Sequence, residues 1–365
     1  MNTPATERVL DTHAHHVGAH AIQRIREDGE RHGVRLVAQD TGGKVLTRVD
    51  VGGRLSGLPL LPQLSDVPAR LAWMAAAGVD AQLVAPWMDL AGYDLDPDDG
   101  LWLSRVQNDS AAELRATDDR FLVAAAVPLQ HPGHAAAELR RAVTELGHSA
   151  VQIGARVGEL GLDDPSLAPF WEAAEELGTP VIVHPAELDV PERMRRLFLH
   201  ILVGNPSETT FAAAALTLGG VLERHPGLRV LLVHGGGFFP YQIGRLDRGF
   251  TAAPPAARAK GELSPRELAG RFWFDTVLHD EAALRHLLDF AGPDRVVLGS
   301  DYPFPMRLDR PVDAYDALGP EPGARSAVLS GTHLIDPAPT ADVSPRTPTS
   351  PTAPPPRDPA ARSTG

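Results

Sequence analysis

The sequence predicts an α/β fold, a (β/α)₈ TIM barrel, and three observations support it. Eight short β-branched or apolar runs recur along the chain, amphipathic stretches of helical period lie between them, and several of these stretches end at glycine. Such alternation is typical of βα units around a parallel sheet, and eight strands can close that sheet into a barrel. The expected strands are Val9–His13, Ala81–Ala85, Phe121–Val127, Ala150–Ile153, Pro180–His184, Arg229–His234, Phe272–Thr276 and Arg295–Gly299.

Helical periodicity between the strands predicts a set of covering helices, and two segments depart from the repeat. Residues 17–65 contain scattered glycines and the turn-rich run GGRLSGLPLLPQLSD, so we expect an insertion after the first strand that covers the C-terminal mouth of the barrel. Residues 336–365 are rich in Pro, Ser, Thr and Ala, which predicts a disordered tail after a folded domain of residues 1–335. The expected helices include Val67–Ala77, Ala135–Leu146, Pro165–Leu177, Thr209–Arg224 and Glu281–Phe290.

The composition excludes several classes of protein. A net charge of −13 offers no basic surplus to replace phosphate counterions, so we expect no nucleic-acid partner. The absence of cysteine excludes disulfides, thiolate nucleophiles and cysteine-ligated metals. No stretch reaches the roughly 18 apolar residues that cross a bilayer, so we expect no membrane association and a cytoplasmic enzyme. Lys44 and Lys260 are the only lysines, which leaves few candidates for Schiff-base chemistry.

Polar residues stand where four of the predicted strands end. The run DTHAH carries His13 and His15, and their alternation points both imidazoles to one side of an extended chain. His184 ends VIVH, His234 ends LLVH, and Asp301 follows VVLGS. Because barrel enzymes place catalytic groups at the C-terminal ends of strands, these side chains are expected to converge. We predict one divalent metal ion held by His13, His15, His184 and Asp301; the donors suit Zn²⁺ best, and Mn²⁺, Fe²⁺ or Co²⁺ also accept them.

His234 is the candidate acid/base beside this metal. The three glycines that follow it allow a close approach of backbone or substrate, although a strand-to-helix turn alone would also explain them. Asp301 is a second group that could move a proton. Asp11 is expected to orient a ligand histidine without binding the metal itself.

Taken together, LDTHAH, VIVHP, LLVHGGGFFPYQIGRLD and VLGSDYPFP resemble the amidohydrolase-2 family, the branch typified by 2-amino-3-carboxymuconate-6-semialdehyde decarboxylase and related metal-dependent aromatic acid decarboxylases. The resemblance runs from about Val9 to Gly331. It implies a barrel with one divalent metal, usually zinc, nonoxidative release of CO₂ and a homodimer. It places the metal ligands as above and makes His234 the residue that activates a metal-bound water. It also makes Arg245 the residue that binds a substrate carboxylate across the dimer interface; a structural ion pair with Asp247 or with a helix neighbour is the alternative.

One missing lysine and two departures from the family pattern bear on the site and the substrate. Binuclear relatives carry a carboxylated lysine at the end of the fourth strand, whereas AVQIGARVG has no lysine, which indicates a mononuclear site. The chain has His184-Pro-Ala-Glu187 where the type enzyme has His-Pro-Trp-Asp, so an aromatic wall of the pocket is missing. The expected substrate-binding arginine falls on Leu58, with Arg54 nearby. We therefore expect related chemistry on a different substrate.

Three functions remain open from the sequence. The first is metal-dependent nonoxidative decarboxylation of a small unsaturated or aromatic carboxylic acid, with His234 or Asp301 moving the proton that replaces CO₂. In that reaction the metal could bind either a hydroxide or the substrate carboxylate. The second is mononuclear hydrolysis of an amide, lactone or related C–N or C–O bond, whose products would carry oxygen from water. The third is a metal-binding scaffold without turnover.

Overall fold

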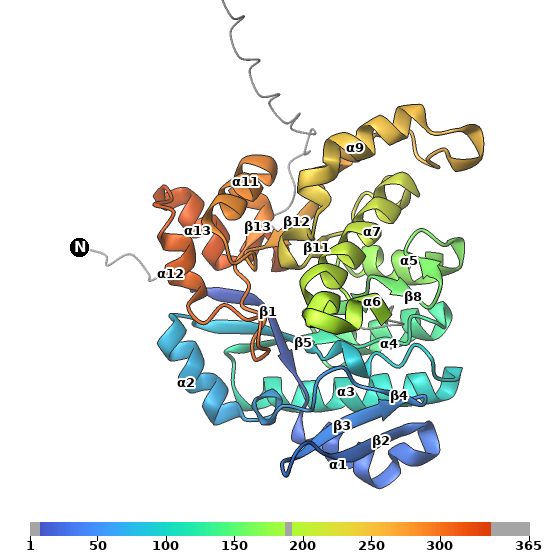
Figure 1. Ribbon diagram of the computed structural model, residues 1–365, viewed down its shortest axis with the longest axis vertical. Coiled ribbons are helices and arrows are strands. Elements are labelled where there is room, and N and C mark those ends of the chain that lie inside the picture. The colour runs from blue at the N-terminus through green and yellow to red at the C-terminus, as the bar shows by residue number, and fades with distance from the viewer. Residues whose placement is uncertain (1–7, 187–191, 337–365) are drawn as a thin grey trace, which may run out of the picture.

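The computed structural model describes residues 8–186 and 192–336, and a parallel barrel lies at its centre (Figure 1). Its eight strands follow the order β1-β5-β6-β7-β10-β11-β12-β13. The first and last strands meet where Thr12 N–H donates to the Leu298 carbonyl over 2.8 Å and where Ala14 bridges Tyr302. The predicted barrel is confirmed. The strands are β1 (Leu10–His16), β5 (Ala81–Pro86), β6 (Phe121–Ala125), β7 (Ala150–Gly154), β10 (Val181–His184), β11 (Val230–Leu232), β12 (Phe272–Asp275) and β13 (Val296–Val297).

Both faces of the barrel strands are buried. Leu83, Ile182 and Leu231 belong to a cluster of buried apolar side chains contributed by successive strands of the barrel. A larger cluster contains the alternate positions, such as Val181 and Val230, together with apolar side chains of the surrounding helices. Burial on both faces explains why the strands read as continuous apolar runs in the sequence.

The helices surround the barrel (Figure 1). They are α2 (Val67–Ala77), α3 (Pro97–Thr117), α4 (Pro132–Thr144), α5 (Ala168–Glu176), α6 (Glu192–Arg195), α7 (Asn205–Leu218), α8 (Val221–Arg224), α9 (Phe239–Ala252), α10 (Pro265–Ala269), α11 (Glu281–Ala291), α12 (Pro311–Asp316), α13 (Pro322–Ser330) and α14 (Thr332–Ile335). Helix α2 matches its predicted bounds because both ends carry strong signals. Asp66 accepts from Ala69 N–H over 2.9 Å at its start, and Gly78 has a φ of 73° at its end.

Two helical segments differ from the sequence expectation. The predicted helix Thr209–Arg224 is wrong as a single element, because Gly220 adopts a φ of 71° and separates α7 from α8. Helix α3 has 21 residues, yet the sequence pattern did not single it out. Its buried face includes Ser104, Asn108 and Ser110, and these polar residues interrupt the apolar period on which such a prediction depends.

Residues 17–65 form a small unit beside the barrel. It contains α1 (Ala19–Asp28) and an antiparallel sheet of β2 (Val34–Asp40), β3 (Val45–Val51) and β4 (Arg54–Leu55). Val34 and Val49 pack in a second apolar cluster that also contains Trp87 and Phe304 from loops at the C-terminal ends of barrel strands. This packing ties the inserted unit to the end of the barrel where the predicted site lies.

The remaining expectations concern the chain end and the membrane. The predicted tail of residues 336–365 lies outside the described residues, except for Asp336. Within residues 8–186 and 192–336, every helix is too short or too polar to traverse a bilayer.

Candidate metal centre

Strand β1 places His13 and His15 side by side at the mouth of the barrel. Its pairing with β5 shifts register between Asp11 and Ala14, around the first of the two histidines. Asp301 N–H donates to the His13 carbonyl over 2.8 Å, which joins this part of β1 to the segment after β13. Both imidazoles are buried, and their Nε2 atoms lie 3.2 Å apart.

Three imidazoles are oriented through their Nδ1 atoms. His15 Nδ1 lies 3.2 Å from the Pro86 carbonyl oxygen and His184 Nδ1 lies 2.6 Å from the Pro185 carbonyl oxygen. A carbonyl oxygen can only accept, so Nδ1 carries the proton in both rings. His13 Nδ1 lies 2.6 Å from Asp275 Oδ2 and donates in the same way. Each ring therefore keeps the lone pair of Nε2 for a metal ion.

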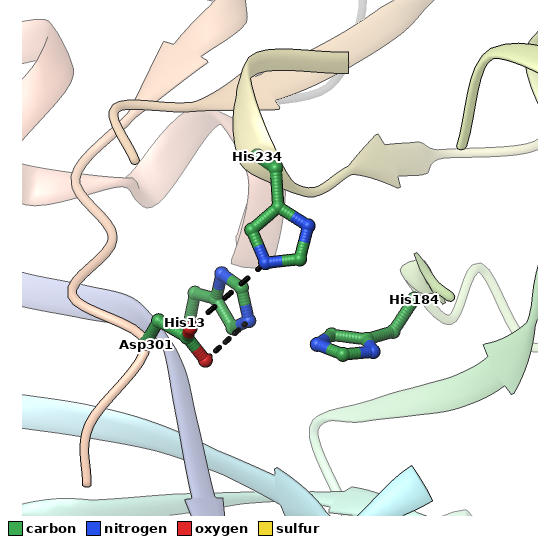
Figure 2. A group of neighbouring side chains, drawn as sticks. All are labelled: His13, His184, His234 and Asp301. Atoms are coloured by element: carbon green, nitrogen blue, oxygen red, sulfur yellow. Dashed lines mark ion pairs between the residues drawn. The ribbon is translucent and has the colours of Figure 1, made fainter. Parts of the chain in front are cut away.

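Asp301 brings a carboxylate to the same space. Its Oδ1 lies 3.3 Å from His15 Nε2 and 3.6 Å from His13 Nε2, and its Oδ2 lies 4.0 Å from His234 Nε2. Figure 2 shows His13, His184, His234 and Asp301 gathered around one point, and one ligand atom from each lies within 4.8 Å of the others. Within the part of the chain that the structure describes, His184 Nε2 and Asp301 Oδ1 are buried and form no hydrogen bond.

The imidazoles of His13, His15 and His184 and the carboxylate of Asp301 are donors that fit one divalent cation. Two Nε2 lone pairs 3.2 Å apart repel each other unless a cation lies between them. Burial lowers the pKa of His15 and of His184 to about 4 and that of His13 well below its usual range, so all three are neutral ligands at pH 7. Burial also raises the pKa of Asp301, and a bound cation would stabilise its ionised form. The residues therefore make a divalent-metal site.

His234 and Asp301 have strained backbones. Their φ angles are 54° and 64°, in a region that residues with a side chain seldom adopt. All three glycines after His234 have positive φ, and a Cβ at Gly236 would lie 2.7 Å from the Phe274 ring. The glycine run is thus required by the turn itself, as the alternative interpretation held. The same turn leaves His234 Nδ1 buried without a hydrogen bond among the described residues, so its tautomer is not fixed as those of the other rings are.

Asp275 is a site residue that the sequence analysis missed. Besides orienting His13, its Oδ1 accepts from Gly235 N–H over 2.8 Å. The signal was available, because Asp275 ends the apolar strand FWFD as His184 and His234 end theirs. Asp11 was expected to orient a ligand histidine, but its carboxylate accepts from the His13 backbone N–H and from Ser300 instead. Asp11 thus holds the backbone of His13 and does not contact an imidazole.

A pocket opens above the cluster. Trp87, Met88 and Phe304 line it from the loops after the strands, and Leu58 lines it from the inserted unit. His184, His234 and Asp301 form its polar floor.

The arginines named in the sequence analysis lie elsewhere. Arg54 forms an ion pair with Asp94 over 2.7 Å, outside the pocket. Arg245 is exposed on α9, and Asp247 pairs with Arg266 over 2.7 Å, so the structural alternative for Arg245 finds no support.

Comparison with known proteins identifies the family to which this chain belongs. A family model described as "Amidohydrolase" matches residues 11–332. The chain belongs to that family. The predicted membership is confirmed, and the match spans nearly all of the described chain.

Two of the proteins to which this chain is similar are decarboxylases. The chain is 40% identical over 242 residues to 2-amino-3-carboxymuconate-6-semialdehyde decarboxylase of Dictyostelium discoideum, covering 66% of this chain and 67% of that protein. The crystal structure of 5-carboxyvanillate decarboxylase from Sphingomonas paucimobilis superposes with a TM-score of 0.75 at 26% identity and covers 90% of this chain and 99% of the other.

A third similarity concerns the fold alone. Dihydroxybenzoic acid decarboxylase from Polaromonas sp. superposes with a TM-score of 0.70 at 19% identity and covers 90% of this chain and 97% of the other. That structure contains manganese and the inhibitor 2-nitroresorcinol.

Proposed function

We propose that this protein is a metal-dependent nonoxidative decarboxylase of a small aromatic or unsaturated carboxylic acid. The observation that carries the proposal is the pair of Nε2 atoms of His13 and His15, 3.2 Å apart beside the Asp301 carboxylate, at the floor of a pocket with apolar walls. The 40% identical relative is a decarboxylase, which favours loss of CO₂ over hydrolysis.

The metal assignment is part of this proposal. We assign His13, His15, His184 and Asp301 as ligands, because their imidazole and carboxylate donors suit Zn²⁺ and also Mn²⁺. The manganese in the Polaromonas enzyme supports Mn²⁺ as an alternative to Zn²⁺ in this site. When bound, such an ion supplies Lewis-acid chemistry to oxygen atoms of the substrate.

The remaining side chains would handle the proton. Loss of CO₂ breaks the bond between the carboxylate carbon and its neighbour, leaves the electron pair on that neighbour, and requires a proton there. Burial lowers the pKa of His234 well below its usual value, so the ring is neutral at pH 7 and would take a proton from water before passing it to that carbon; its Nδ1 has no hydrogen-bond partner among the described residues. Asp301, 4.0 Å from His234 Nε2, is near enough to exchange that proton through one water molecule.

We also propose that the enzyme is a homodimer that places Arg245 in the site of its partner. Exposed apolar side chains lie on the neighbouring elements around α7 and α9, namely Val203, Phe211, Phe238 and Tyr241. Such a patch is typical of a protein interface. Arg245 lies on α9, which extends away from the barrel in Figure 1, and it does not line the pocket of its own chain. A second copy would let its guanidinium bind a substrate carboxylate. A cytoplasmic location also belongs to the proposal.

The experiment is CO₂ release from manganese- or zinc-loaded protein with muconate-like, salicylate-like and hydroxybenzoate-like acids. The variant His234→Ala serves as the blank. Release by wild type alone supports the proposal. Protein that contains one metal per chain, releases no CO₂ from any acid, and hydrolyses amides or lactones with oxygen from water would be a hydrolase.

A further inference from the structure

The turn that carries Asp301 has a backbone conformation that needs support. Its φ of 64° is unfavourable for a residue with a Cβ, so the surrounding contacts must hold it in place. Its carboxylate faces the rings of His13 and His234 (Figure 2), 3.6 Å from Nε2 of the first and 4.0 Å from Nε2 of the second. The left-handed backbone therefore decides where this carboxylate points.

Ser300 supplies hydrogen bonds on both sides of Asp301. Its hydroxyl accepts from Tyr302 N–H over 3.1 Å and so closes the turn. The same hydroxyl donates to Asp11 Oδ2 over 2.5 Å, and Ser300 N–H donates to Asp11 Oδ1 over 3.0 Å. Ser300 is fully buried and lies outside both the pocket lining and the cluster of donors. It therefore acts on the site through its neighbours.

Asp11 is anchored from the opposite side. Its Oδ2 also accepts from Gln82 Nε2 over 2.8 Å, and Gln82 Oε1 accepts from Arg70 over 3.0 Å. Its Oδ1 also accepts from His13 N–H over 3.1 Å. Asp11, Gln82 and Arg70 are all fully buried, so these hydrogen bonds are shielded from water. This buried network connects α2 and β5 to the turn of Asp301.

We propose that Ser300 is a positioning residue for the metal centre. Held by Asp11, its hydroxyl fixes the left-handed turn that points the Asp301 carboxylate at the imidazoles. Without this hydroxyl, Tyr302 N–H and Asp11 Oδ2 each lose a buried partner, and the strained φ of Asp301 is free to relax. The inference rests on the proposed function, in which Asp301 is a metal ligand and exchanges a proton with His234.

Metal affinity and the spectrum of the bound ion test the inference apart from turnover. Mn²⁺ would be titrated into the full chain, with its affinity measured by competition and the geometry of its site by electron paramagnetic resonance. Ser300→Ala should bind Mn²⁺ about 10-fold more weakly and change the spectrum, as when the support of a ligand is removed. Ser104→Ala, which removes another buried serine hydroxyl, on α3, is the matched control and should behave as wild type. Wild-type affinity or a wild-type spectrum in folded Ser300→Ala protein would overturn the proposal.

A pair of substitutions tests the hydrogen bonds without removing the serine. In Asp11→Asn, the amide oxygen would serve the two backbone N–H groups, and its NH₂ group would face the NH₂ group of Gln82, so Mn²⁺ should bind more weakly. Adding Gln82→Glu gives this NH₂ group an acceptor and keeps the net charge, and Ser300 Oγ can then donate to the His13 carbonyl 3.3 Å away. The double variant should recover most of the affinity that Asp11→Asn loses. An affinity no better than that of Asp11→Asn would contradict the role of the network.

Turnover separates this inference from the proposed function. At saturating Mn²⁺, folded Ser300→Ala protein should have a lower kcat and nearly the same KM, because Asp301 stays in the site but no longer faces His234 in the same way. Wild-type protein that releases no CO₂ from any acid, with Mn²⁺ binding still weakened in Ser300→Ala, would refute the proposed decarboxylase alone. An active wild type whose Ser300→Ala variant binds Mn²⁺ normally would overturn the role of Ser300 alone.

Discussion

Asp275 connects the metal ligand on β1 with the turn that carries His234. Its Oδ2 lies 2.6 Å from His13 Nδ1, while its Oδ1 accepts from Gly235 N–H over 2.8 Å and from Val277 N–H over 3.1 Å. One buried carboxylate thus fixes the ring of a ligand and the backbone beside the candidate acid/base. Both carboxylate oxygens of Asp275 accept hydrogen bonds. An asparagine at this position would therefore turn its NH₂ group toward one of these donors.

Asp275→Asn is expected to weaken metal binding about 10- to 100-fold, as loss of the partner of a ligand histidine commonly does. The amide oxygen would serve Gly235 and Val277, and its NH₂ group would then face His13 Nδ1. His13 would have to move its proton to Nε2, where it blocks the metal. Competition against a fluorescent chelator measures the affinity, with exposed Asp289→Asn as the control. Unaltered affinity in folded Asp275→Asn protein would show that this carboxylate does not orient the ligand.

Single histidine variants should separate ligands from the acid/base. His184→Ala is predicted to lose both the metal and turnover, because Nε2 of His184 is aimed at the cluster and has no other partner among the described residues. His15→Ala should also lower metal content. His234→Ala should retain the metal and lose turnover. Metal content by mass spectrometry, read beside CO₂ release, checks each variant. If His234→Ala lost the metal and His15→Ala kept it, His234 would be the metal ligand and His15 would not.

Sequence patterns located most of this site because its donors obey a positional rule. His13, His184 and Asp301 each follow an apolar run, and the C-terminal ends of parallel strands meet at one mouth. The same rule applied to FWFD would have included Asp275. Other features depend on contacts that periodicity does not encode. The pocket wall combines Leu58 of the inserted unit with Trp87 of a barrel loop, and the polar buried face of α3 obscured that helix.

Arg245→Ala is predicted to raise KM for a carboxylate substrate while metal content stays constant. In the proposed homodimer the guanidinium from the partner would bind the substrate and would not touch the metal ligands. Arg248→Ala, also exposed on α9, is the matched control. Steady-state kinetics gives the comparison. An unchanged KM would remove Arg245 from the substrate site.

Mixed dimers test whether Arg245 acts across the interface. Co-expression of Arg245→Ala and His234→Ala chains with different tags yields heterodimers in which one of the two sites has its own His234 and an Arg245 from the other chain. Such heterodimers should recover about half of the wild-type activity, since one site in each symmetric pair is intact. If Arg245 acted within its own chain, the heterodimer would have only about half the activity of the Arg245→Ala homodimer, since its other site lacks His234.

Arg70→Met should destabilise the fold beneath the metal centre. The Arg70 side chain extends from α2, is fully buried, and donates to the His15 carbonyl and to Gln82 Oε1, whose amide in turn donates to Asp11 over 2.8 Å. Burial lowers the pKa of Arg70 to about 10, so the guanidinium remains charged at pH 7. Methionine fills similar space but leaves two buried acceptors without a donor.

Urea denaturation should therefore show that Arg70→Met lowers the free energy of unfolding by about 2–5 kcal/mol, the cost of two unsatisfied buried groups. Arg120→Met removes an exposed ion pair with Asp118 and should change stability little, because water screens that pair. Metal affinity of folded Arg70→Met protein should also fall, since the His15 carbonyl that Arg70 fixes belongs to a proposed ligand. A stable Arg70→Met protein with normal metal affinity would mean that the backbone of β1 keeps both histidines in place without the buried guanidinium.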